Sequence, residues 1–285
     1  MVKTGVSIGT VWDRTTGFVS DNLTAIVPIS LLTIFVPSSV GSALESVTTP
    51  AHLAWVVSLA SLVLMIVSLL GQLALTALVI DPASRMGAIR RGFARLAPAF
   101  GVFLIVVIGI VLLALPIAGI AIAYGATFSP VSTNMSMAGM PEGAAGPILL
   151  YVIALVAVLL WLTARLMVAT PVIVAERRGL SALKRSFAIT RGMTWKLMGV
   201  VLLYAVVVTV ATLAARSVFG AIFALVAGGA NGELGVAQVL TAIVVSLVTT
   251  VFTVLQAVFV AQLYRAAAGD LAAPVGIVEG PAELP

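Results

Sequence analysis

The chain of 285 residues contains no cysteine and only one histidine, His52. Without cysteine it forms no disulfide, no thiolate nucleophile and no Cys-ligated metal site, so thiols give no information about the redox compartment. It also lacks an HExxH motif, a Walker loop and a GxGxxG loop. These absences predict a protein that is not an enzyme and that needs no cofactor.

Charged residues are also scarce. They make up 9% of the chain, against roughly 25% in soluble domains, while 61% of residues are hydrophobic and the mean hydropathy is +1.23. This composition predicts an integral membrane protein. The net charge of +5 resides in short gaps between apolar runs, so anionic lipid headgroups are a better match for it than nucleic acid.

Long apolar runs dominate what remains. Each is long enough to cross about 30 Å of hydrocarbon as a helix, and none alternates as a barrel strand does. We therefore expect an all-α integral membrane protein with six transmembrane helices in a single membrane domain, residues 1–285. Kinks are expected at Pro28, Pro37, Pro116 and Pro171. The six runs are residues 22–44, 52–80, 98–125, 147–175, 197–228 and 235–267.

Outside Arg165 and Arg216, positive charge falls only at alternate ends of these runs. Thirteen of the fifteen Lys and Arg residues lie in the N-terminal segment, after the second and fourth runs or, for Arg265, at the end of the sixth run, and the other gaps hold only Glu45, Glu142 and Glu233. Because Lys and Arg accumulate in cytoplasmic loops, this pattern predicts a multi-pass protein of the bacterial inner membrane with both termini in the cytoplasm.

Three segments that precede spans resemble one another when Trp12, Phe93 and Phe187 are aligned. The chain is therefore predicted to contain three repeats, each an amphipathic interfacial helix followed by a membrane hairpin. The segments are residues 7–23, 87–103 and 181–197; the repeats cover about 5–80, 81–175 and 176–268, and residues 269–285 are expected to form a flexible C-terminal tail.

The second and third segments carry basic residues beside an apolar stripe with helical spacing. Such helices, here 84–97 and 180–196, lie in the membrane interface, where each basic residue contributes about 1 kcal/mol at an anionic surface. They also fit ordinary elbows packed against the bundle, and Asp81 and Glu176 are expected to cap them. The candidate lipid or anion contacts are Arg85, Arg90, Arg91, Arg95, Arg177, Arg178, Lys184, Arg185, Arg191 and Lys196.

Arg165 and Arg216 lie inside predicted spans, where an ionisable side chain is costly and often functional. Arg216 is far enough along its span to reach the outer headgroups. Arg165 is the better candidate for an internal anion contact. The alternative is a structural pair with Gln72 or Gln256, the other intramembrane polar candidates.

The loop at 126–146 is rich in Gly, Pro, Ala, Ser and Met, which predicts a flexible external loop or a lid. Within it, Met135, Met137 and Met140 are soft thioether ligands suited to Cu(I). No Cys or nearby His completes a ligand set. Copper handling is therefore a weak alternative, and no metal site is predicted.

The stretch 164–203 and the end of the last run carry a recognisable set of residues: Arg165, Pro171, Glu176, Ala182, Leu183, Ser186, Arg191 and Trp195, with a Leu-Tyr-Arg at 263–265. This set resembles the signature of the glycerophosphoryl diester phosphodiesterase membrane-domain family and the related YciC-like inner-membrane proteins. The resemblance implies a six-span bacterial inner-membrane protein connected with phospholipid or envelope metabolism. Some relatives carry a soluble phosphodiesterase domain, which is not expected in this chain, so the enzymatic name does not carry over.

These observations together favour a non-enzymatic membrane protein that engages anionic phospholipid, either in lipid or envelope handling or as an accessory subunit of a larger membrane assembly. Its expected partners are membrane lipids, the alternatives are a membrane protein or a second copy of the chain, and no nucleic acid is expected. The rival class is a small-solute or anion transporter with a path near Arg165 and Pro171. A membrane enzyme is a weaker alternative.

Overall fold

The structure is a computed structural model that describes residues 7–46, 51–82, 85–123, 143, 145–226 and 236–272. About 93% of these residues are helical, and the described part contains no strand. Six of its helical segments are long and apolar enough to cross a membrane. They are Leu23–Leu44, Ala54–Ile80, Leu96–Ile120, Gly146–Glu176, Thr194–Val226 and Val236–Gly269. The prediction of six helical spans is confirmed within a few residues at each end.

Short helices alternate with long ones along the chain. The order is α1 (Ile8–Asp21), α2 (Leu23–Ser30), the π-helix η1 (Leu31–Phe35), α3 (Val36–Ser46), the 3-10 turn η2 (Ala51–Leu53), α4 (Ala54–Ile80), α5 (Arg85–Ala94), α6 (Leu96–Ala123), α7 (Ala145–Leu166), α8 (Ala169–Glu176), α9 (Ser181–Ile189), α10 (Thr194–Val226) and α11 (Val236–Ala272). The last helix continues four residues beyond the predicted end of the third repeat, and the rest of the tail lies outside the described residues.

One of the spans breaks beside a proline. The fourth span breaks between α7 and α8, just before Pro171, as its missing donor predicts. The first span passes through the π-helix η1, which lies between Pro28 and Pro37. By contrast, α6 runs as one helix through Pro116.

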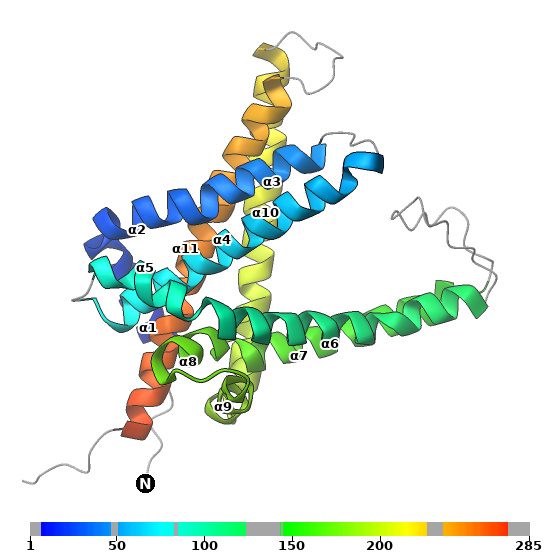
Figure 1. Cartoon of the computed structure of the whole chain (residues 1–285). Helices are drawn as coiled ribbons and strands as arrows, with labels where there is room; N and C mark the ends of the chain where they lie inside the picture. Colours follow the sequence, from blue (N-terminus) through cyan, green and yellow to red (C-terminus); the bar gives the residue numbers. More distant parts are fainter. Residues whose placement is uncertain are drawn as a thin grey trace, which may run out of the picture.

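The buried core lies at one end of the bundle. The C-terminal ends of α4 and α11, the start of α6 and the helices α1, α5, α8 and α9 meet there (Figure 1). Its largest fully buried side chains include Leu73, Leu78, Val172, Leu197 and Leu263. From this end the α10–α11 pair and the α6–α7 pair run in different directions, the latter to the right of Figure 1.

Away from that end the spans expose their apolar side chains. In the most apolar 18-residue stretch of each span, only 6% of the residues are buried in α6, 6% in α10 and 33% in α11. Leu112, Leu150 and Leu203 are more than half exposed. In water this surface would drive aggregation, whereas lipid tails solvate it. The chain therefore reads as a multi-pass membrane protein in which the core fixes one end and lipid covers the rest.

Candidate functional site

The helix α5 packs on α4 through its smallest residues. Ala88 is fully buried, and a Cβ added at Gly92 would lie 3.0 Å from the backbone nitrogen of Ala74. The larger apolar residues therefore face outward, with Ile89 50% and Phe93 68% exposed. This is the orientation expected of a helix that lies at the membrane interface. Arg90, next to Ile89 on α5, is also exposed.

Arg91, the next basic residue on α5, points back to the protein. Its Nη1 donates to Oδ2 of Asp81 at 2.8 Å, and Asp81 is the C-cap residue of α4. The prediction that Asp81 caps the following helix is therefore wrong. The carboxylate instead joins the end of a span to the short helix that follows it.

Glu176 makes the equivalent contact in the next part of the chain. Its Oε1 accepts from Nε of Arg185 on α9 at 3.1 Å and from the hydroxyl of Tyr264 on α11 at 3.2 Å, and its Oε2 pairs with Nε of Arg178 at 2.9 Å. Glu176 is the last residue of α8, so the prediction that it caps α9 is also wrong. The next residue, Arg177, adopts a left-handed conformation with φ of 54° that ends α8.

These contacts divide the predicted lipid-contact residues into two groups. Arg91, Arg178 and Arg185 are paired with carboxylates. The second group consists of exposed side chains that form no ion pair or hydrogen bond with the described part of the chain: Arg90, Arg177, Lys184, Arg191 and Lys196. Arg95 is half-buried, and the side chain of Arg85 lies outside the described residues.

Arg165 lies at the end of α7 and binds α9. Its Nη1 donates to the backbone oxygen of Phe187 at 3.1 Å, and the guanidinium carbon lies 5.6 Å from the ring centroids of both Trp161 and Phe187. Its partner is thus a carbonyl near a helix C-terminus, where cations are favoured, and neither Gln72 nor Gln256.

Arg216 projects from α10 in a different environment. Its side chain is exposed, and within the described residues it makes no ion pair or hydrogen bond. Arg265 near the end of α11 donates from Nη1 to the backbone oxygen of Val79 at 3.3 Å, which again places an arginine on the last carbonyls of a helix.

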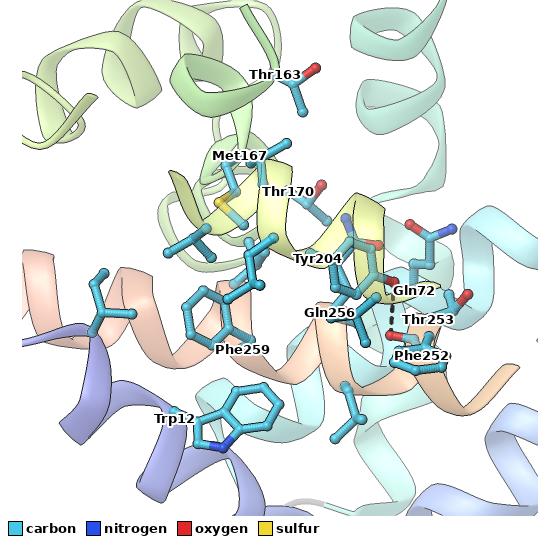
Figure 2. Close-up of a pocket in the computed structure, with 18 of the residues that line it drawn as sticks. Trp12, Gln72, Thr163, Met167, Thr170, Tyr204, Phe252, Thr253, Gln256 and Phe259 are labelled. Carbon is cyan, nitrogen blue, oxygen red and sulfur yellow. Dashed lines mark hydrogen bonds between the residues drawn. The ribbon is translucent and has the colours of Figure 1, made fainter. Parts of the chain in front are cut away.

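A cavity of about 590 Å³ opens between α1, α4, α10, α11 and the bend that joins α7 to α8 (Figure 2). This volume is within the roughly 300–1,000 Å³ typical of small-molecule sites. Most of its lining is apolar, from residues such as Met167, Val207 and Phe259. Its polar lining comes from uncharged side chains, namely Gln72, Thr76, Thr163, Thr170, Tyr204, Thr253 and Gln256.

The two glutamines reach the cavity from different helices, Gln72 from α4 and Gln256 from α11, and both are exposed to it. Within the described part of the chain neither amide forms a hydrogen bond. Tyr204 is anchored, because its hydroxyl donates to the backbone oxygen of Phe252 at 3.1 Å. Arg165 is absent from the lining, although its neighbours Thr163 and Met167 belong to it.

Sequence reasoning singled out Gln72 and Gln256 but missed the cavity and most of its lining. A signal was present. Gln72 and Thr76 are four residues apart, and Thr253 and Gln256 are three apart, so each pair lies on one face of its span. Polar side chains that repeat on one face of an apolar helix indicate a polar surface inside the membrane.

Other predicted features do not join this site. The loop at 126–146, with Met135, Met137 and Met140, lies almost wholly outside the described residues. In the described part, no three His, Asp or Glu side chains group as metal ligands do. His52 is exposed in η2, at the opposite end of α4 from Asp81.

Comparisons with known proteins add no relative: no protein-family model, no curated protein and no solved structure matches the chain.

Proposed function

We propose that this chain is a multi-pass protein of the bacterial inner membrane that engages anionic phospholipid through the short basic helices α5 and α9, in lipid or envelope handling or as an accessory subunit of a membrane assembly. The observation that carries the proposal is the orientation of α5. Its small residues, Ala88 and Gly92, pack on α4, so Ile89, Phe93 and the unpaired Arg90 are left on the outer face.

The helix α9 supports the same assignment with a different residue pattern. Ala182, Ser186 and Ile189 are buried, while Leu180 and Lys184 are exposed. Just beyond it, Trp195 is 84% exposed next to the exposed Lys196. Tryptophan beside lysine is typical of the membrane–water interface, where the ring and the ammonium both meet headgroups.

We also infer that α1, α5 and α9 begin three repeats and that both termini are cytoplasmic. In the alignment on Phe93 and Phe187, Arg91 corresponds to Arg185, and each of them binds a carboxylate at the end of the preceding helix, Asp81 or Glu176. Ala88 corresponds to Ala182, and both are fully buried. Equivalent residues thus make equivalent contacts, although the first copy has Thr10 in place of the arginine.

The direct test is analysis of the lipids and proteins that co-purify with the full chain after mild detergent extraction from a bacterial membrane. The proposal predicts enrichment of phosphatidylglycerol and cardiolipin over phosphatidylethanolamine, and loss of that enrichment when Arg90 and Lys184 are changed to Gln. A stoichiometric co-eluting membrane protein would favour the accessory role. Lipid retention identical to that of the bulk membrane would refute lipid engagement.

Because the same residues are expected to set orientation, each variant needs a topology control. Accessibility of a cysteine introduced at position 238, near the far end of the last span, to a membrane-impermeant reagent reports whether the hairpins have kept their orientation. A variant that loses anionic lipid but keeps this accessibility separates lipid binding from insertion.

A further inference from the structure

The cavity lies inside the membrane-spanning part of the bundle. Gln72 precedes Asp81, at the end of α4, by nine residues, and Gln256 precedes Arg265 on α11 by nine residues. At the helical rise of 1.5 Å per residue, both amides lie about 13 Å from the basic end of the bundle. Trp12 of α1, which begins the first repeat, also lines the cavity, so the cavity extends from this depth to the membrane interface and is open to an occupant from the membrane.

The lining sets the chemistry of that occupant. No charged side chain lines the cavity in the described part of the chain. A charged headgroup would therefore be buried without a partner, which is costly. An uncharged occupant meets no such cost, and its apolar part is matched by Met167, Phe259 and the half-exposed Trp12.

The polar groups are arranged to receive one uncharged oxygen-bearing group. Gln72, Gln256, Thr253 and Tyr204 lie together in Figure 2, while Trp12 and Phe259 lie away from them. Each glutamine amide offers two donors and one acceptor that no described residue uses. The Tyr204 hydroxyl already donates to the backbone oxygen of Phe252 and so is left as an acceptor. Ester carbonyls and a hydroxyl satisfy this set.

We propose that the cavity binds one molecule of an uncharged acylglycerol, with its ester carbonyl or hydroxyl bonded to Gln72 and Gln256 and an acyl chain against the apolar wall. The inference goes beyond the engagement of anionic phospholipid on the outer faces of α5 and α9, because it concerns a different surface and a lipid without charge. It assigns the chain two lipid sites of different chemistry.

The test uses the full chain in nanodiscs of phosphatidylcholine that contain a few per cent of dioleoylglycerol, with bound lipid quantified by native mass spectrometry. Gln72→Leu combined with Gln256→Leu should reduce dioleoylglycerol retention by about 25-fold, since each of the two lost hydrogen bonds is worth about a factor of five. Gln238→Leu is the matched control, because Gln238 is exposed on α11 and does not line the cavity. Equal retention by the double variant and the control would overturn the proposal.

A second pair of variants keeps the proposal testable if the double variant misfolds. Val207 lines the cavity and its neighbour Val206 does not, while both are about half exposed on α10. Val207→Trp should fill the cavity and abolish dioleoylglycerol retention, whereas Val206→Trp should retain it. Loss in both variants, or in neither, would contradict the assignment.

The two lipid sites are separated by a crossed comparison. Arg90→Gln with Lys184→Gln should lower phosphatidylglycerol retention and leave dioleoylglycerol retention unchanged. Gln72→Leu with Gln256→Leu should lower dioleoylglycerol retention and leave phosphatidylglycerol retention unchanged. If phosphatidylglycerol displaces dioleoylglycerol from the wild-type chain at equal concentration, the cavity accepts a charged lipid and the proposal is wrong. If Arg90→Gln with Lys184→Gln leaves phosphatidylglycerol retention unchanged while the cavity variants behave as expected, only the proposed function is refuted.

Discussion

Ser186 donates its hydroxyl proton to the backbone oxygen of Arg165 over 2.7 Å, and so a side chain of α9 satisfies a carbonyl at the end of α7. Arg165 returns the contact, since its guanidinium binds the backbone oxygen of Phe187. The last carbonyls of a helix have no partner within it. This reciprocal pair therefore satisfies one such carbonyl on each helix and fixes the break before Pro171 against α9.

Replacement of Ser186 by Ala should destabilise the protein by about 1 kcal/mol, because Ser186 is fully buried and its removal leaves the Arg165 carbonyl with only the longer bond from Thr190, at 3.4 Å. The measurement is the thermal unfolding midpoint in detergent. Ser181→Ala, at an exposed position of the same helix, is the control and should leave the midpoint unchanged. Equal midpoints for the two variants would contradict the role given to Ser186.

Replacement of Arg165 by Met should lower the unfolding midpoint more than Ser186→Ala does. The variant loses the bond to the Phe187 carbonyl and the stacking of the guanidinium on Trp161 and Phe187, each worth on the order of 1 kcal/mol. Phosphatidylglycerol retention, measured on the folded fraction, should stay at the wild-type level. Loss of that lipid without loss of stability would show that Arg165 is an anion site after all.

A larger residue at Gly92 should separate α5 from α4. The Cβ of Gly92→Val would lie about 3 Å from backbone atoms of Ala74, which cannot move as a side-chain end can, and the expected cost is about 1–3 kcal/mol. Gly101→Val, where nothing lies within 4 Å of the added Cβ, is the matched control. Protease accessibility of the α4–α5 connection in detergent should increase for the first variant only.

Glu176→Gln should destabilise the joint between α8, α9 and α11 by about 1–2 kcal/mol, because the carboxylate pairs with two arginines and is 19% exposed. Tyr264→Phe removes only the hydroxyl bond to the same carboxylate and should cost less. The unfolding midpoints of Glu176→Gln and Tyr264→Phe, measured at low and at high salt, test whether the ion pairs of Glu176 stabilise this joint. The difference between them should shrink at high salt, and a salt-independent difference would argue against ion pairing.

The six spans could be predicted from the sequence because a continuous apolar run is stable in a bilayer only as a helix. The break in the fourth span could also be predicted, because Pro171 removes a backbone donor. The roles of Asp81 and Glu176 could not be predicted. A carboxylate before a helix reads locally as a cap, whereas these two belong to the end of the helix before it and bind arginines that the turn brings back. That choice is made by tertiary packing, which the local pattern does not encode.

The division of the basic residues was also beyond the sequence. Arg90 and Arg91 are adjacent in an apparently uniform basic patch, yet one is exposed and the other holds Asp81. The difference arises because Ala88 and Gly92 set which face of α5 meets α4. Similarly, Gln72 and Gln256 were identifiable as polar residues in spans, but only the packing of α4 with α11 brings them to one cavity.

The most direct measurement of the central claim compares two double variants with the same change in charge. Arg90→Gln with Lys184→Gln removes exposed, unpaired charges, and Arg91→Gln with Arg185→Gln removes charges that bind Asp81 and Glu176. Phosphatidylglycerol retention in nanodiscs at about 0.1 M salt, with topology checked in each variant, should fall about tenfold in the first and by less than half in the second. Equal losses in the two variants, or none in the first, would contradict lipid engagement through the outer faces of α5 and α9.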